Sequence, residues 1–169
     1  APDMASMALY FLCEGGHQVS AQWLATRHVL GSANARAAAS EALCGACAHD
    51  HLALAQWLAQ RFALGPADAR VLCNALCAAC AYGHLAVAQW LESAFGLTAA
   101  DARSRVYALY AACANGHLVV LQWLASHFGL TAADARAQDN YALREACAQG
   151  YPAAQWLAAR FGLTAADAR

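Results

Sequence analysis

The sequence predicts an all-α protein, a helical solenoid of five repeats of about 33 residues each. Three observations predict this fold. The triplet Gln-Trp-Leu occurs five times, at intervals of 34, 33, 33 and 33 residues, and each copy lies on the apolar stripe of a segment with helical periodicity. Glycine or a substitute separates the helical segments at matching positions. The five copies use every tryptophan of the chain, namely Trp23, Trp57, Trp90, Trp123 and Trp156.

The elements of one repeat are clearest between residues 104 and 136. Residues 107–114 are good helix formers and predict a first helix. Gly116 ends this helix, because glycine readily adopts the left-handed conformation that closes a helix. A second helix is expected over 117–127, with apolar residues spaced to form one face.

A third, single-turn helix is predicted over Leu130–Arg136. Thr131 is its expected N-cap, and Asp134, three residues later, completes a capping box. The acidic residue near the start and the arginine at the end both suit the helix dipole. Each repeat is therefore expected to contain two helices and a short helical turn.

The repeats are expected at residues 1–36, 37–70, 71–103, 104–136 and 137–169, stacked into a single solenoid domain. Two of them contain an extra residue, which is expected in loops at 37–40 and 137–140. Asp50 stands where the other repeats have a turn glycine. Aspartate tolerates the positive φ that this position requires.

The turn segments 83–87, Gly-His-Leu-Ala-Val, and 116–120, Gly-His-Leu-Val-Val, resemble the ankyrin repeat at its usual 33-residue period. The resemblance extends over essentially the whole chain. It departs from the family where Tyr107-Ala108-Leu109-Tyr110 replaces the usual Thr-Pro-Leu-His and where a helical turn replaces the β-hairpin finger. The variant is similar to ankyrin-like arrays of giant viruses, algae and protists. The resemblance implies a concave face that binds a protein partner.

Composition excludes several classes of function. The net charge is −1 and only 12% of the residues are charged, so the chain has no electrostatic footprint for nucleic acid. No apolar run approaches the roughly 18–20 residues of a membrane span. The chain opens at Ala1 without an initiator methionine, which we interpret as processing or as a fragment of a longer array.

We call a set of equivalent positions in the five repeats a column. Columns that keep the same residue type in every repeat usually stabilise the packing of one repeat on the next. We therefore assign the five tryptophans to the structural core. The histidines that follow the first turns (His17, His51, His84, His117) are expected to be structural, because neighbouring repeats about 8–10 Å apart hold them too far apart to share one metal ion. A cysteine column (Cys13, Cys47, Cys80, Cys113, Cys147) is expected to be buried and apolar.

Two CxxC motifs, Cys44 with Cys47 and Cys77 with Cys80, suggest a zinc or redox site. Two of these cysteines belong to the buried column, however, and cysteines three apart on a helix lie too far apart for a disulfide. We expect no metal and no cofactor. Reduced thiols favour an intracellular location.

Columns that vary between repeats are the candidates for partner binding. They are rich in tyrosine and poor in charge, as interfaces often are. The predicted binding residues are Leu72, Asn74, Cys77, Tyr82, Arg105, Tyr107, Tyr110, Asn115, Asp139, Tyr141 and Arg144.

The sequence contains no recognisable catalytic constellation, so we predict a non-enzymatic protein-interaction module with an unidentified protein partner. One alternative is a structural or linker subunit of a larger assembly. It is suggested by the apolar first helix at residues 7–12 and by the absence of polar capping helices, since further repeats or neighbouring subunits could cover both ends. A third hypothesis is a zinc or redox protein that uses the CxxC motifs.

Overall fold

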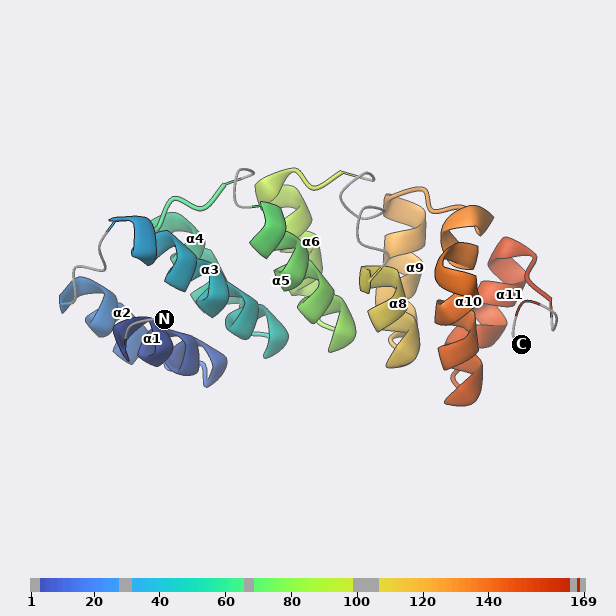
Figure 1. Cartoon of the computed structure of the whole chain (residues 1–169), viewed down its shortest axis with the longest axis horizontal. Coiled ribbons are helices and arrows are strands. Elements are labelled where there is room, and N and C mark those ends of the chain that lie inside the picture. Colours follow the sequence, from blue (N-terminus) through green and yellow to red (C-terminus); the bar gives the residue numbers. More distant parts are fainter. Residues whose placement is uncertain (1–3, 28–31, 66–68, 99–106, 165–166, 168–169) are drawn as a thin grey trace. The chain divides into compact units, whose positions relative to one another are not determined.

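The structure is a computed structural model that describes residues 4–27, 32–65, 69–98, 107–164 and 167. Every regular element of these residues is an α-helix and none is a strand, which confirms the all-α prediction (Figure 1). The helices are α1 (Met4–Glu14), α2 (Gln18–Arg27), α3 (Ser32–Ala48), α4 (Leu52–Arg61), α5 (Ala69–Ala81), α6 (Leu85–Phe95), α8 (Tyr107–Ala114), α9 (Leu118–His127), α10 (Ala132–Ala148) and α11 (Pro152–Phe161).

The turn between the two helices of each repeat contains a residue with positive φ. Four of the repeats have glycine there, and Asp50 adopts the same conformation at φ 61°. This confirms the predicted substitution of the turn glycine by aspartate. The glycine angles are 70° at Gly16, 80° at Gly83, 74° at Gly116 and 68° at Gly150.

In the second to fifth repeats, the end of the second helix has a similar left-handed residue. Gly96, Gly129 and Gly162 have φ of 61°, 57° and 63°. In the second repeat this position is Ala63, at φ 49°. An L-residue with a Cβ in this conformation costs roughly 1–2 kcal/mol, so Ala63 stores local strain that the glycines avoid.

The capping box at the start of α10 is present as predicted. Thr131 Oγ1 accepts a hydrogen bond from the Asp134 backbone N–H, and the Asp134 carboxylate accepts one from the Thr131 backbone N–H at 2.7 Å. The helix does not stop after one turn, however. It continues without a break to Ala148.

The prediction of loops at 37–40 and 137–140 is therefore wrong, because α3 and α10 run through both segments. Neither segment contains glycine or proline, and 37–39 are three alanines, the best helix formers. Once a capped turn has formed, adding residues to a helix is easier than starting a new one. Within α10, Asn140 has φ 57°, a local departure from helical geometry.

The leucine of the Gln-Trp-Leu triplet is the residue that reaches the core. Leu58, Leu91 and Leu157 are fully buried, and Leu24 and Leu124 nearly so. Each neighbouring Trp points elsewhere, since adjacent residues on a helix do not share a face. Trp23 is 56% exposed, which is contrary to its assignment to the core, and the other four tryptophans are partly buried.

Two compact units divide the chain. The N-terminal unit comprises residues 1–79 and 86–96, and the C-terminal unit comprises 80–85 and 97–169. In the first, α1 packs against α2 and α3, and α3 packs against α4; in the second, α8 packs against α9 and α10, and α10 packs against α11. Within each unit, first helices such as α3 and α10 lie in front of second helices such as α4 and α11 (Figure 1). None of the described helices is long and apolar enough to cross a membrane.

Candidate functional site

The predicted partner-binding residues divide between the two units. Asn74 and Cys77 lie on α5 in the N-terminal unit, where Asn74 is exposed and Cys77 is partly buried. The C-terminal unit holds Tyr82, Tyr110, Asn115, Tyr141 and Arg144. Arg105 lies outside the described residues, and so do the side chains of Leu72, Tyr107 and Asp139.

Tyr110 on α8 and Tyr141 on α10 form a pair, which we call the tyrosine pair. Their ring centroids are 4.5 Å apart at an interplanar angle of 50°, and the Tyr110 hydroxyl donates a hydrogen bond to the Tyr141 hydroxyl at 3.3 Å. This hydrogen bond, followed by partial burial and the nearby Glu145, raises the pKa of Tyr110 to about 12. The Tyr110 phenol is therefore neutral at physiological pH, and the pair presents two rings and their hydroxyl groups.

Arg144 lies three residues after Tyr141 on α10, which puts it on the same face of the helix. Its side chain is exposed, and Tyr141 is 38% exposed. Tyrosine and arginine are the residue types that most often dominate the energetics of an interface. The tyrosine pair and Arg144 together form the candidate site, which lies entirely within the C-terminal unit.

The two turn residues of the predicted set differ in availability. Tyr82 is 59% exposed and stacks on His84, with ring centroids 6.3 Å apart. Asn115 is exposed, but its side-chain amide donates a hydrogen bond to the Ala111 carbonyl at 2.9 Å. The amide of Asn115 thus binds its own helix end, and Tyr82 is the more accessible contact.

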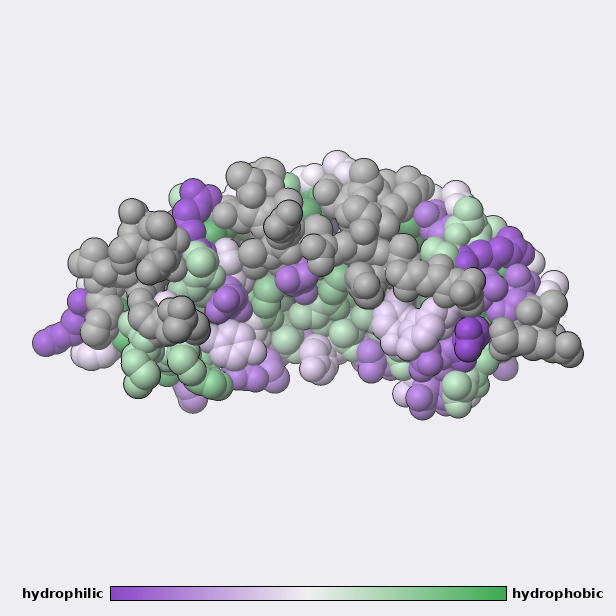
Figure 2. Space-filling model, viewed as in Figure 1, coloured by the Kyte–Doolittle hydropathy of each residue, from purple (hydrophilic) through white to green (hydrophobic). Residues whose placement is uncertain are grey.

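Surface hydropathy differs between the two units. Over α8 and α10, Figure 2 shows pale and purple residues of intermediate to hydrophilic character. Over α1 it shows a group of green, hydrophobic residues. Met4 and Phe11, which are 84% and 60% exposed, belong to that helix.

The histidine column packs on the preceding turns. A Cβ added to Gly16 would lie 2.6 Å from the His51 ring, and one added to Gly83 would lie 2.5 Å from His117. His51 Nε2 also donates a hydrogen bond to the Glu14 carbonyl at 3.2 Å. Neither His51 nor His117 caps its own helix with a side-chain hydrogen bond. These histidines therefore join one repeat to the turn of the previous one.

The cysteine column is buried at four of its five positions: Cys13, Cys47, Cys80 and Cys113. Burial raises the pKa of Cys13 and of Cys113 to about 12, so both remain neutral thiols. Cys147 is exposed, which is contrary to the prediction. It lies on α10.

The CxxC motifs combine one buried and one partly buried thiol each. Burial first, then Cys77 and Glu41, raise the pKa of Cys44 to about 12. Such thiols are poor nucleophiles and poor metal ligands until they are deprotonated. Among the described residues, no group of three or more His, Cys, Asp or Glu side chains could hold a metal ion.

Two concave surfaces of the N-terminal unit were not predicted from the sequence. One, of about 250 Å³, is lined by Met7, Tyr10, Phe11 and Glu41. It could have been found from Phe11, which occupies a column that is small or polar in every other repeat. The other is a groove beside Trp90, which was missed because the whole tryptophan column was assigned to packing.

Comparison with known proteins identifies no relative: no protein-family model matches the chain, and neither a curated protein nor a solved structure is significantly similar to it. The resemblance to ankyrin repeats therefore remains a prediction from the sequence pattern, and any function has to be inferred from the geometry of the chain itself.

Proposed function

We propose that this chain is a non-enzymatic protein-interaction module, an ankyrin-like solenoid that binds a protein partner through the tyrosine pair and Arg144. The observation that carries the proposal is the Tyr110–Tyr141 pair, with centroids 4.5 Å apart and Tyr141 38% exposed, on the same helix face as the exposed Arg144. In an array whose constant columns fill the core, such variable and exposed residues are free to contact a partner.

The pair is suited to binding because each ring restrains the other. A side chain that is already ordered loses less conformational entropy when a partner arrives, and this saving is typically about 0.5–1.5 kcal/mol per immobilised side chain. Tyrosine adds a large apolar ring and a polar hydroxyl with only two rotatable side-chain bonds. Arg144 can donate hydrogen bonds to carbonyl or carboxylate groups of the partner.

A structural role in a larger assembly is the second candidate, and the first repeat favours it. Val19 is 80% exposed and Trp23 is 56% exposed. They line a concavity of about 390 Å³ together with Ala8, Leu12, Ser20 and Leu24. An exposed apolar patch of this kind is typical of an interaction surface. Light scattering separates the two roles, since a stable assembly would give a mass well above that of one chain.

The test of the binding module is site-specific capture. A photo-reactive phenylalanine at position 141 should cross-link a partner in extracts of the native source, and the identified partner can then be titrated. Tyr110→Ala combined with Tyr141→Ala should weaken its binding by at least about tenfold, since hot-spot residues each contribute more than about 1–2 kcal/mol.

The matched control is Val119→Ala, which removes a side chain that is 62% exposed on α9. It should leave binding unchanged. If the tyrosine double variant binds the partner as tightly as the unchanged protein, the proposed site is wrong. If instead its melting temperature falls steeply, the two tyrosines serve packing.

A further inference from the structure

One face of α1 is exposed, although the corresponding faces of α3 and α10 are buried. Ala8 and Leu12 on α1 are partly exposed. Their counterparts are alanines that are at most 4% exposed: Ala42 and Ala46 on α3, and Ala142 and Ala146 on α10. Both of these helices pack against the first helix of the preceding repeat, since α3 packs against α1 and α10 packs against α8. The exposed face of α1 is therefore the one that a preceding first helix covers in α3 and α10.

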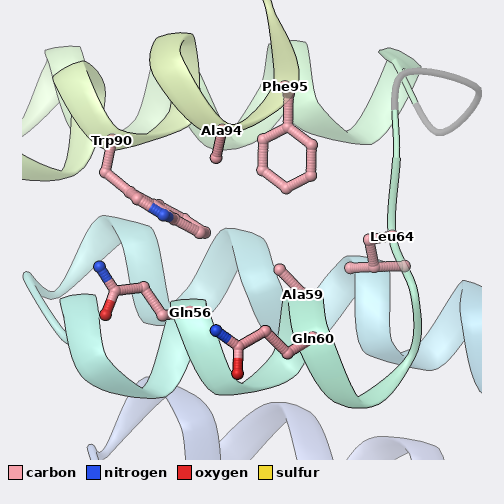
Figure 3. A pocket seen from close by; sticks show the side chains of 7 residues that line it. All are labelled: Gln56, Ala59, Gln60, Leu64, Trp90, Ala94 and Phe95. Carbon is pink, nitrogen blue, oxygen red and sulfur yellow. The ribbon is translucent and has the colours of Figure 1, made fainter.

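The second helix of the first repeat, α2, is exposed on the same side. In the third repeat, Trp90 on α6 extends towards α4, the second helix of the preceding repeat, and lines a groove with Gln56 and Ala59 (Figure 3). No described helix precedes α1, and Trp23 on α2 is 56% exposed. A concavity of about 390 Å³ lies on this side. We call four of the residues that line it the leading face: Ala8, Leu12, Ser20 and Trp23.

The opposite face is exposed on α10. Cys147 of this helix is exposed, whereas Cys13 on α1 and Cys113 on α8 are fully buried in the same column. Both α1 and α8 pack against the first helix of the next repeat, which is α3 or α10. No described first helix follows α10. We call Cys147, Ala148 and the turn glycine Gly150 the trailing face.

The contact between successive turns is likewise open on both sides. A Cβ added to Gly16 would lie 2.6 Å from the His51 ring of the next repeat. No described atom lies within 4 Å of a Cβ added to Gly150, which has the same place in its own turn. His17 is exposed, whereas its counterpart His51 is partly buried. The leading side therefore offers a ring, and the trailing face offers a turn of the kind on which such a ring packs.

The residue sizes in the contacts between first helices indicate what fits the leading face. A Cβ added to Gly45 on α3 would lie 3.6 Å from the backbone N of Glu14 on α1, so these two helices approach closely. In the equivalent positions of α8 and α10, the small residue is Ala114 on α8 and the large one is Glu145 on α10. Both contacts thus combine a large residue on one helix with a small one on the other, as interdigitated packing favours.

Phe11 on α1 and Ala148 on α10 form another pair of this kind, because Phe11 has the position of Gly45 and Ala148 has that of Glu14. We propose that the leading face of one chain binds the trailing face of a second copy of the chain. In this contact α1 packs on α10 of the second copy in the way that α3 packs on α1, and the His17 ring lies on the Gly150 turn of the second copy.

The proposed contact joins two different surfaces, so it is heterologous and leaves one face of each kind open for a further copy. It gives the first-repeat surface, on which the second candidate function depends, a specific occupant. The tyrosine pair takes no part in it, so the inference does not depend on the proposed partner site.

The test uses two variants that each block one face. Leu12→Glu places a carboxylate on the leading face, and Cys147→Glu places one on the trailing face. Light scattering of the unchanged chain, in a reducing buffer that prevents disulfides through Cys147, should give a mass that rises with concentration from that of one chain to that of two or more. Either variant alone should associate at least about a hundredfold more weakly, because association would bury an unpaired carboxylate.

A mixture of the two variants is the decisive measurement. Each variant keeps the face that the other has lost, so an equimolar mixture should form a pair of one chain of each kind and grow no further. A contact between two leading faces would give a different result: Leu12→Glu alone would abolish it, Cys147→Glu would leave it intact, and mixing would restore nothing. That result would overturn the proposal.

Val119→Glu is the matched control, since it introduces the same charge at a side chain that is 62% exposed on α9. It should keep the helical signal and the mass of the unchanged chain, as should the variant with both tyrosines of the tyrosine pair changed to alanine. Loss of association in either control would overturn the proposal. So would a mass of one chain up to the solubility limit, or a mixture of the two blocked variants that does not associate. Retained association of the tyrosine variant separates this test from that of the proposed partner site.

Discussion

The first and fourth repeats carry the same Gln-Trp-Leu triplet but expose it differently. Trp23 in the first repeat is 56% exposed. Trp123 in the fourth is only partly exposed, with its ring stacked on His127 at 5.5 Å and edge-on to Phe128 at 5.6 Å. The leucines behave alike, since Leu24 and Leu124 are both buried. The Gln-Trp-Leu triplet therefore determines that the leucine faces the core. The residues around each tryptophan determine how much of its ring is exposed to solvent.

The first helices of these repeats show the same contrast. Ala112 in α8 is fully buried, and the corresponding Leu12 in α1 is partly exposed. Phe11, which is 60% exposed, corresponds to Ala111. Small residues let packed helices approach closely, and large ones at the same column leave an apolar surface facing solvent. The first repeat thus has the core of the others and a different outer surface.

The largest expected effect tests this contrast directly. Leu124→Ala should lower the free energy of unfolding by about 2–5 kcal/mol, because it opens a cavity at a buried position. Trp23→Ala should cost less than about 1 kcal/mol, as is usual for an exposed side chain. Urea denaturation followed by circular dichroism measures both. Equal losses would mean that Trp23 is covered in solution by a contact that the structure does not contain.

The next prediction concerns the turn glycines, where a matched pair is available. Gly16 and Gly150 have nearly the same φ, 70° and 68°, but only Gly16 has a ring, that of His51, within reach of an added Cβ. Gly150→Ala should cost about 1 kcal/mol for the left-handed conformation alone. Gly16→Ala should cost about 2–4 kcal/mol, because the Cβ also collides with the imidazole.

A double variant separates these two costs. His51→Ala added to Gly16→Ala should recover the steric part and leave the conformational part, apart from the loss of the hydrogen bond to Glu14. Stability is again measured by urea denaturation. If Gly16→Ala and Gly150→Ala cost the same, the packing of histidine on the preceding turn contributes nothing, and the histidine column needs another explanation.

Much of the fold could be predicted from the sequence because the residues that end and begin helices recur at equivalent positions of the repeats. The glycines and Asp50 mark the turns, the Thr131–Asp134 box marks a helix start, and both are properties of a few adjacent residues. The course of α3 and α10 was not predicted, since an extra residue in a repeat was assumed to lengthen a loop. Helix propagation through the alanines at 37–39 shows that it can instead join two helical segments.

The candidate site was harder to predict for a physical reason. Whether Tyr110 contacts Tyr141 depends on the distance between two helices, which no single repeat specifies. Likewise, the tryptophans were assigned to the core because their column is constant, although Trp23 is 56% exposed. A residue type that is the same in every repeat is predicted to stabilise the packing of the helices. The solvent exposure of its side chain also depends on the neighbouring residues, which differ between repeats.

A smaller effect is expected at the end of the second helices, where the second and fourth repeats differ. Ala63 has φ 49° and Gly129 has φ 57°. Ala63→Gly should stabilise the chain by about 0.5–1 kcal/mol, because it relieves the left-handed strain at some cost in unfolded-chain entropy. Gly129→Ala, the reverse change, should destabilise by a similar amount, since nothing lies within 4 Å of an added Cβ there. Thermal unfolding measures the change in stability of each variant. Two changes of the same sign would contradict this account.

The smallest effect is expected at the hydrogen bonds between Thr164 and Asp167, and it depends on pH. The Asp167 carboxylate accepts hydrogen bonds from the Thr164 backbone N–H at 2.7 Å, from the Thr164 hydroxyl at 2.9 Å and from Arg136 Nε at 3.1 Å. The two bonds from Thr164 first, and then that from Arg136, lower the pKa of this carboxyl below its usual range. A carboxyl with a lowered pKa stabilises the folded state above its ordinary pKa, near 4. The contribution is lost as the pH falls through the lowered value.

Asp167→Asn should therefore reduce the urea midpoint slightly at pH 7, and the difference from the unchanged chain should vanish as the pH falls through the lowered pKa. Arg136→Gln removes the ion pair to Asp167 but keeps the Thr164 bonds, so its effect should be smaller and should weaken with added salt. The order of the two effects is the informative result. If Arg136→Gln lowered the midpoint more than Asp167→Asn, the bond from Arg136 rather than the bonds from Thr164 would be the main reason that this aspartate is ionised.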